Sequence, residues 1–431
     1  MRSSRSGFFI TKIKMIADIK NKKFYPWLVV ILLSGVAFLN YMDRQMLSTM
    51  RFAMSEDIIE VATSYTGPWG WGALMAAFMW IYGLMSPVSG AIADRLNRKY
   101  LIVGSLFVWS AVTFLMGYVD NYWQLYALRA VMGFSEALYI PAALSLIADI
   151  HNGKTRSIAI GIHMTGLYLG QIAGGFGSIF SSKLEWQNVF LLCGLVGMIY
   201  SAVLIMFISD PGREKKQAVS NQPSVFKTIS LVLTNVAFWA VLFVFTTLSM
   251  PGWATKNWLP ELLAKVINSN WGIEIGKAMD YAGPIAVISL AGASFIGAMI
   301  GGKLSDKWVE KNVRGRVYTS CIGLALIVPS LVFMGLGNSL FAVVVAILSF
   351  GIGYGFFDTN NMPILCQFVP SNQRATAYGF INMAGVLGGA AITTALGNLS
   401  LGTGFALLGG VVVLSLLVQI TILRPKTVNM E

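Results

Sequence analysis

Charged side chains are scarce in this chain. Only 12% of the 431 residues are Asp, Glu, Lys or Arg, whereas hydrophobic residues make up 56%. Soluble domains carry roughly 25% charged residues, so the composition excludes an ordinary soluble protein of this length. The net charge of +12 does not require nucleic acid as a partner, because the basic residues are dispersed along the chain.

Metal-binding and nucleophilic residues are also few. The three cysteines, Cys193, Cys321 and Cys366, fall in or at the end of apolar runs, and the only histidines are His151 and His163. No Cys/His cluster has metal-site spacing, and no GxxxxGK[ST] loop is present to bind ATP. We therefore expect no cofactor, no metal site, no ATP-driven pump and no enzyme.

Long apolar runs account for most of the sequence. Twelve of them have about 18–27 residues, enough to cross the hydrocarbon of a bilayer as helices, and none alternates like a β-barrel strand. The predicted fold is therefore an all-α membrane protein with twelve transmembrane helices. The predicted spans are 26–48, 69–93, 100–118, 122–148, 157–182, 187–209, 235–256, 283–303, 317–336, 339–366, 375–399 and 402–424.

The spans divide into two equal sets. A polar stretch at 210–234 separates the first six from the last six and predicts a cytoplasmic linker. The sequence therefore predicts an N-terminal six-helix bundle over 26–209 and a C-terminal one over 235–424. We expect cytoplasmic tails at 1–25 and 425–431.

Basic residues predict the orientation. With both termini in the cytoplasm, the inner segments carry 24 of the 31 Lys and Arg residues, in agreement with the positive-inside rule. The short loops suit a bacterial inner membrane. There the basic residues of the inner loops would contact anionic lipid head groups. We expect the protein to be a monomer. The long outer connections, 49–68 and 257–282, are expected to be irregular. The basic residues at the outer side are Arg51, Lys183, Lys256, Lys265 and Lys277.

A short motif follows the second span of each half. Its residues are Gly90, Asp94, Arg95 and Arg98 in the first copy and Gly302 and Asp306 in the second. The acid lies four residues after the glycine on one helix face, and the glycine allows two backbones to approach. Two such gates in equivalent halves indicate two bundles that rock around a central site, as in a carrier.

Charged residues inside the spans are the sharpest chemical signal. Asp43 and Arg44 lie near the end of the first span, and Arg129 and Glu136 share one face of the fourth. Such residues are costly in a bilayer and usually face a bundle interior or an aqueous cavity. Because helix rise places Asp43, Arg44 and Arg129 at similar depth, we expect Asp43 to pair with Arg129 and Arg44 to face the cavity.

These four residues predict a site that binds protons and an anion. A carboxyl group removed from water can hold a proton near neutral pH, so Glu136 and Asp43 are the predicted proton carriers. The guanidinium of Arg44 can bind a carboxylate with two hydrogen bonds, which predicts an anionic substrate. The alternative is that the four residues only form a satisfied ion-pair network.

Polar residues on other spans extend the predicted substrate site. Amides suit the hydroxyl groups of a sugar, an aromatic ring can stack on it, and a buried histidine can titrate near neutral pH. The alternative for these residues is packing or interhelical hydrogen bonding, and Asp358 fits either this site or an inner gate. The predicted substrate-binding residues are Arg44, Arg129, Tyr139, His163, Gln171, Asn360, Asn361 and Asn382.

The repeated motif and the twelve spans resemble the major facilitator superfamily. Residues 40–45 and 257–260 are similar to the anion:cation symporter family, whose members take up hexuronates and other organic anions with protons or Na⁺. This resemblance implies that Arg44 contacts the substrate carboxylate and that Asp43 and Glu136 carry protons. Residues 133–137 also resemble spinster-like lipid transporters.

The expected function is proton-coupled uptake of a small organic anion, such as a hexuronate or another sugar acid, by alternating access. H⁺ is the expected coupling ion and Na⁺ the alternative. A spinster-like lipid or lysolipid carrier, a proton-driven exporter and a non-transporting receptor of the same fold stay open as alternatives.

Overall fold

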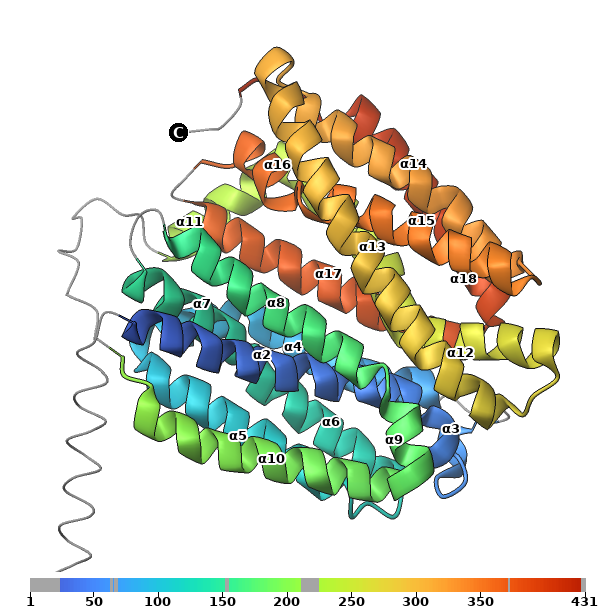
Figure 1. The fold of residues 1–431 in the computed structure, drawn as a ribbon. Helices are drawn as coiled ribbons and strands as arrows, with labels where there is room; N and C mark the ends of the chain where they lie inside the picture. Colours follow the sequence, from blue (N-terminus) through green and yellow to red (C-terminus); the bar gives the residue numbers. More distant parts are fainter. Residues whose placement is uncertain are drawn as a thin grey trace, which may run out of the picture.

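The computed structural model describes residues 24–62, 65, 69–151, 155–210, 225–370 and 373–427. Every regular element in these residues is a helix (Figure 1), so the predicted all-α fold is confirmed. Eleven of the helices are long and apolar enough to cross a membrane, and the shorter apolar helix Ile158–Gly174 stands in the place of the predicted fifth span.

The helices form two bundles. The N-terminal bundle contains α2 (Tyr25–Thr49), α3 (Arg51–Met54), η1 (Ile59–Val61), α4 (Trp71–Arg95), α5 (Arg98–Met116), α6 (Tyr122–Ala137), α7 (Tyr139–Ile150), α8 (Arg156–Gly174), α9 (Gly177–Leu184) and α10 (Trp186–Phe207). The C-terminal bundle contains α11 (Val225–Thr234), α12 (Val236–Trp271), α13 (Ile275–Lys311), α14 (Gly315–Leu336), α15 (Leu340–Asp358), α16 (Asn361–Phe368), α17 (Arg374–Gly397) and α18 (Leu401–Thr421).

Two of the spans are interrupted at equivalent places. The fourth span breaks between α6 and α7, and the tenth breaks between α15 and α16. In each case a proline, Pro141 or Pro363, lies in the first turn of the following helix, where its missing N–H costs no helical hydrogen bond. The break in the tenth span places Asp358 and Asn361 on either side of an irregular pair of residues.

Close packing of α2 on α8 depends on a row of glycines. Side chains at these positions would collide with the backbone of α2, so the two helices can approach only because the Cβ atoms are absent. Gly166, Gly170 and Gly174 of α8 face Ser34, Phe38 and Met42 of α2, one helical turn apart. These three glycines, spaced four residues apart, therefore form the surface on which α2 packs.

One predicted irregular connection is wrong, and the predicted linker contains a helix. The connection predicted at 257–282 is helical except near residues 272–274, because α12 continues through Pro260 to Trp271 and α13 begins at Ile275. The predicted linker at 210–234 contains helix α11, and its residues 211–224 lie outside the described part, as do residues 1–23 of the predicted tail. A hydropathy window ends a span where charged residues begin, although the backbone can stay helical.

The bundles meet firmly at one end of the molecule. There Arg51 of α3 forms a buried ion pair with Glu261 of α12, and the Ser178 hydroxyl donates to the carbonyl oxygen of Met279 (3.2 Å). We call this the closed end. Figure 1 shows α8 and α13 together at this end and diverging towards the other, which we call the open end.

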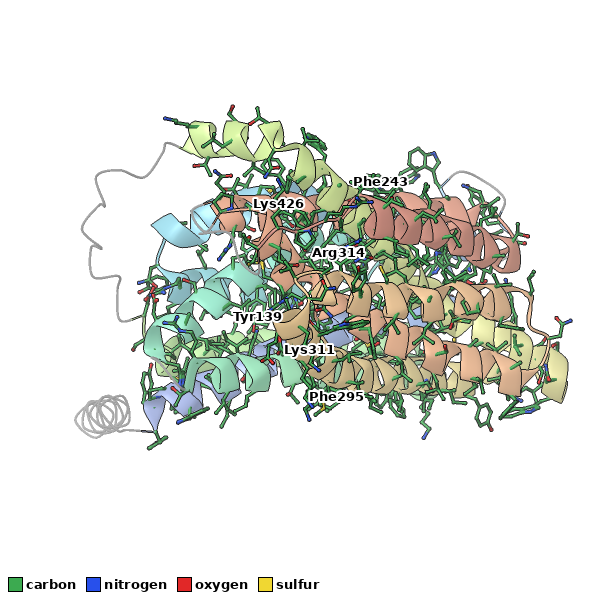
Figure 2. The ribbon with its side chains drawn as sticks, turned by 90° about the horizontal axis from the view of Figure 1, so that it is seen from above. Tyr139, Phe243, Phe295, Lys311, Arg314 and Lys426 are labelled. Carbon is green, nitrogen blue, oxygen red and sulfur yellow. The ribbon has the colours of Figure 1, made fainter. Side chains whose placement is uncertain are left out.

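Large apolar side chains cover the outside of the bundles. Phe243 of α12 and Phe295 of α13 are both exposed and lie on different sides of the molecule when it is seen from above (Figure 2). Such exposure is expected of helices that face lipid, since hydrocarbon solvates apolar side chains.

Candidate functional site

A cavity of about 300 Å³ lies between the two bundles. Its walls come from α2 and α8 on one side and from α12, α13, α15, α16 and α17 on the other. Among the predicted substrate-binding residues, Gln171, Asn361 and Asn382 line this cavity, and so does Asp358. The Asn382 amide also donates to the Ser86 hydroxyl across the bundles (3.0 Å). Substrate contact by these residues stays a prediction.

Among the described residues, Lys256 of α12 is the only lysine or arginine that lines the cavity. Its Nζ lies 5.2 Å from the centre of the Trp253 ring and 6.0 Å from that of Tyr354, and it forms no ion pair within 4.0 Å with any residue that the structure describes. The Gln45 amide of α2 donates to the Lys256 carbonyl oxygen (3.3 Å), which ties this turn of α12 to the other bundle.

The sequence analysis placed Lys256 at the outer edge of its span, because the apolar run ends there. The sequence does contain evidence for a cavity position. Helical spacing places Lys256 on the same face as Ser249, Gly252 and Trp253. All four residues line the cavity. Continuation of that face past the apolar run identifies Lys256 as a cavity residue.

A second charged cluster lies inside the N-terminal bundle. Arg44 Nε of α2 donates to Glu136 Oε2 of α6 at 2.5 Å, and the two side chains are 11% and 0% exposed. The guanidinium carbon of Arg44 lies 5.0 Å from the centre of the Tyr41 ring and 4.7 Å from that of Tyr82. Because Tyr41 also lines the cavity, its ring stands between Arg44 and the cavity.

This arrangement corrects the predicted pairing. Arg44 pairs with Glu136 and does not line the cavity, and Asp43 does not form an ion pair with Arg129 among the described residues. Asp43 accepts a hydrogen bond from the Thr113 hydroxyl (3.2 Å) instead. Helix spacing predicts which of these residues share a face and a depth, but it cannot select among the charged partners that lie close together there.

The cluster retains unused hydrogen-bonding capacity. Several of its buried polar atoms have no hydrogen-bond partner in the protein, although such atoms are normally paired. This marks the cluster as a polar interior whose hydrogen bonds can rearrange. The atoms are Asn40 Nδ2 and Oδ1, Asp43 Oδ1, Arg44 Nη2, Arg129 Nε and Glu136 Oε1.

Besides Arg44, four predicted substrate-binding residues lie away from this cavity. Arg129, Tyr139 and His163 are enclosed within the N-terminal bundle; the Tyr139 hydroxyl donates to the Leu33 carbonyl oxygen (2.7 Å). Figure 2 shows Tyr139 among the helices rather than at an outer edge. Asn360 is buried between α13 and α15, where it accepts from the Ser305 hydroxyl. The Tyr139 ring packs against Trp109 and His163, with ring centres 5.6 and 5.9 Å away, so packing inside the bundle accounts for this side chain.

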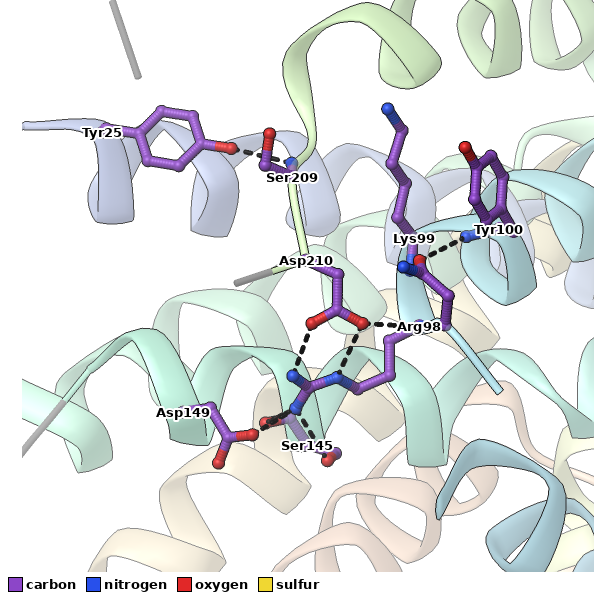
Figure 3. A network of polar contacts seen from close by, with 9 residues as sticks. Tyr25, Arg98, Lys99, Tyr100, Ser145, Asp149, Ser209 and Asp210 are labelled. Atoms are coloured by element: carbon purple, nitrogen blue, oxygen red, sulfur yellow. Dashed lines mark hydrogen bonds and ion pairs between the residues drawn. The ribbon is translucent and has the colours of Figure 1, made fainter. Parts of the chain in front are cut away.

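The predicted gate motif lies at the open end. Arg98, buried at the start of α5, donates to Asp149 and to Asp210 (2.6 Å between Nη2 and Oδ1), as Figure 3 shows. Asp306 is 75% exposed and lies 3.7 Å from Arg316. The side chains of Asp94 and Arg95 lie outside the described part.

The glycines of the motif do not pack as predicted. A Cβ at Gly90 would meet nothing within 4 Å, and one at Gly302 would touch only the Thr359 hydroxyl. The close backbone approach expected at Gly90 is absent because the bundles are apart at this end.

Comparisons with known proteins identify what the chain is similar to. The model of the Major Facilitator Superfamily matches residues 33–393. The chain is 24% identical over 400 residues to the probable galactarate/D-glucarate transporter GarP of Escherichia coli (strain K12), covering 83% of this chain and 84% of that one. It is 25% identical over 403 residues to protein spinster homolog 1 of Homo sapiens, covering 86% and 72%.

A solved structure shows the same fold. It is a bacterial homologue of the human lysosomal transporter spinster in an inward-facing and unoccupied conformation. The TM-score is 0.68 at 19% identity, and the match covers 93% of this chain and 96% of that one. The matched relatives are transporters, in agreement with the prediction that the chain is not an enzyme.

Proposed function

Because this chain belongs to the Major Facilitator Superfamily, we propose that it is a proton-coupled symporter that takes up a small organic anion by alternating access. A sugar acid such as a hexuronate is the preferred substrate class. The similarity to a galactarate/D-glucarate transporter supports that class. The family match and the long apolar helices show that the chain is a multi-pass membrane transporter. The coupling ion, the direction of transport and the substrate are what we propose.

The observation that carries the proposal is the unpaired Lys256 ammonium in the cavity. A cation inside a membrane protein is costly unless an anion or a polar group compensates it. The rings of Trp253 and Tyr354 lie beside the Lys256 ammonium, and a cation over a ring gains about 0.5–2 kcal/mol. Asp358 lines the same cavity, but no carboxylate of the described residues lies within 4.0 Å of the ammonium. The carboxylate of an entering substrate supplies the missing charge, and polar side chains such as Gln171 and Asn382 are placed to accompany its hydroxyl groups.

Charge balance in the N-terminal cluster supports proton coupling. Asp43 and Glu136 offset Arg44 and Arg129 while both carboxyl groups are ionised. When Glu136 takes up a proton, Arg44 loses its partner at 2.5 Å and the cluster becomes positive behind Tyr41. In a low-dielectric interior this charge attracts an anion in the adjacent cavity. Proton uptake and anion binding thus favour one another.

Alternating access assigns roles to the two ends. In the proposed orientation both termini and the open end face the cytoplasm of a bacterial cell, surrounded by inner-membrane lipids. Loading from outside requires the contacts of the closed end, including Arg51–Glu261, to separate. We propose H⁺ as the coupling ion, with Na⁺ as the alternative, and a monomer as the transporting unit.

Uptake of galactarate into proteoliposomes tests the proposal. We expect an inward proton gradient to drive accumulation, and we expect Lys256→Met to reduce uptake by about tenfold or more, because the lost charge interaction is worth at least 1.4 kcal/mol. Lys256→Arg should retain part of the activity. Lys311→Met, an exposed lysine at the open end, is the matched control.

Two outcomes would contradict the proposal. Uptake by Lys256→Met at the rate of the control shows that the cavity cation does not bind the substrate. If uptake by the unmodified protein does not depend on the proton gradient, transport is not coupled to protons. Exchange in right-side-out vesicles decides between uptake and export.

A second candidate is a carrier of lipids or lysolipids. The chain is similar to a spinster homolog, and apolar residues of α8 and α13, among them Met164, Leu167 and Leu290, line the cavity where these helices diverge. Competition decides between the candidates: a lysolipid that displaces galactarate at micromolar concentration favours the lipid carrier. No displacement favours the anion symporter.

A further inference from the structure

Asp358 brings a negative charge into the same cavity. It ends α15, its side chain is exposed, and it lines the cavity together with Lys256. The two charges interact electrostatically, but no ion pair within 4.0 Å joins them. The cavity therefore presents one cation and one anion that do not neutralise each other by direct contact.

The surroundings of Asp358 are rich in hydrogen-bond acceptors. Within the described part of the chain, the Asp358 side chain has one hydrogen bond, which the Asn361 Nδ2 donates to Asp358 Oδ1 at 3.1 Å. The Asn361 Oδ1 atom is buried and has no partner. A carboxylate can only accept, and so can the amide oxygen, so these groups together require a ligand that donates hydrogen bonds.

Aromatic rings border the same region. Tyr168, Tyr354 and Tyr378 line the same cavity as Asp358. The face of an aromatic ring attracts positive charge, and the Lys256 ammonium already lies 6.0 Å from the centre of the Tyr354 ring. A sugar hydroxyl supplies one donor without charge, whereas a primary ammonium supplies three donors and a full positive charge.

We propose that the substrate is a small zwitterion, an acid that also carries a primary amine, with its carboxylate towards Lys256 and its ammonium towards Asp358 and Asn361. The inference rests on the proposed transport function and narrows its substrate from an organic anion to an amino-bearing acid. A ligand with both groups compensates both charges, whereas a simple anion leaves Asp358 without a cation. An acid of the sugar class with an amino group satisfies both proposals.

Titration calorimetry on the purified full chain tests the inference with three related probes. D-Glucosaminate carries both groups, D-gluconate has the acid without the amine, and D-glucosamine has the amine without the acid. We expect the Kd of glucosaminate to be about tenfold lower than that of either partial probe, which corresponds to about 1.4 kcal/mol. Asp358→Asn should abolish this preference, because glucosaminate loses the partner of its ammonium whereas gluconate loses only a repelling charge.

Two further variants separate the contributions. Lys256→Met should weaken the binding of both acids and should not weaken that of glucosamine, because it removes a charge that attracts the acids and repels the amine. Glu310→Gln removes an exposed carboxylate of α13 that does not line the cavity, and it should retain the preference for glucosaminate.

The results distinguish this inference from the function on which it rests. Equal affinity for gluconate and glucosaminate, or a preference that survives in Asp358→Asn, overturns the zwitterion while the anion symporter stands. Binding of neither acid also overturns it, and galactarate uptake then decides the transport proposal separately.

Discussion

Arg44 and Glu136 are joined inside the N-terminal bundle, where little water screens their charges. The two side chains are nearly or fully buried, and breaking a buried pair by removing one partner leaves an uncompensated charge at a cost of about 3–5 kcal/mol. Protonation of Glu136 is a reversible form of that change. The pair is therefore suited to respond to a proton and to transmit the change to the cavity past Tyr41.

Glu136→Gln should uncouple transport from the proton gradient. One pH unit is worth about 1.4 kcal/mol, so one proton per substrate supports about tenfold accumulation. We expect the variant to equilibrate galactarate across proteoliposomes without accumulating it, measured at zero membrane potential. Glu310→Gln is the control. Accumulation by Glu136→Gln at the unmodified level contradicts the role of Glu136 as the proton carrier.

At the residue scale, sequence predicts the charged cluster better than its connections. Because a charge is costly in a membrane, charged residues within apolar spans are expected in the bundle interior. Asp43, Arg44, Arg129 and Glu136 do lie there. The cost of charge could not assign Arg44 to Glu136, because side-chain conformations decide between partners of similar depth. Lys256 was misplaced because charge was taken as the end of its span.

At the scale of helices, the α2–α8 contact depends on the missing side chains of α8. A Cβ at Gly170 would overlap the Phe38 carbonyl group, whereas one at Gly161 of the same helix would meet nothing within 4 Å. The same helix thus offers a buried test position and a free control position.

Gly170→Ala should therefore destabilise the protein, and Gly161→Ala should not. We expect a loss of about 1–3 kcal/mol at Gly170, since the extra methyl group forces two packed helices apart. At Gly161, alanine should be neutral or stabilising, because it favours helix over glycine. Thermal unfolding in detergent measures both. Equal melting temperatures for the two variants contradict the packing role of Gly170.

The packing surface formed by Gly166, Gly170 and Gly174 could be predicted, because glycines four residues apart can be recognised in the sequence alone. The lengths of α12 and α13 could not, because their ends extend beyond the apolar runs. Glu261 and Lys265, one turn apart, form an ion pair with an Nζ–Oε1 distance of 2.8 Å, which supports helix in a segment that polarity alone marks as a loop. Hydropathy indicates where the apolar segment ends, but the helix itself can continue beyond that point.

At the scale of the whole molecule, the sequence predicts two bundles but not which end is closed. A carrier has to form contacts at each end in turn, so the residues for both arrangements are present at once. The structure selects one arrangement. Arg51 and Glu261 are buried across the closed end, while Gly90 faces open space at the other.

Glu261→Gln should therefore open the closed end. It leaves Arg51 buried without its counter-charge, and losing even 1.4 kcal/mol of closure raises the open fraction about tenfold. A cysteine at Thr49, which is buried beside Gly283 at the seam, reports this opening. With the three native cysteines replaced by alanine, we expect an impermeant maleimide to label Thr49→Cys about tenfold faster in this variant.

Two controls separate opening from a general loss of structure. Lys265→Met removes the more exposed partner of Glu261 and should change the labelling rate little. Arg51→Met combined with Glu261→Met removes both charges, and it should restore slow labelling because apolar side chains can replace a buried ion pair without loss of stability. If Glu261→Gln is labelled as slowly as the protein with Glu261 intact, the Arg51–Glu261 ion pair does not keep this end closed.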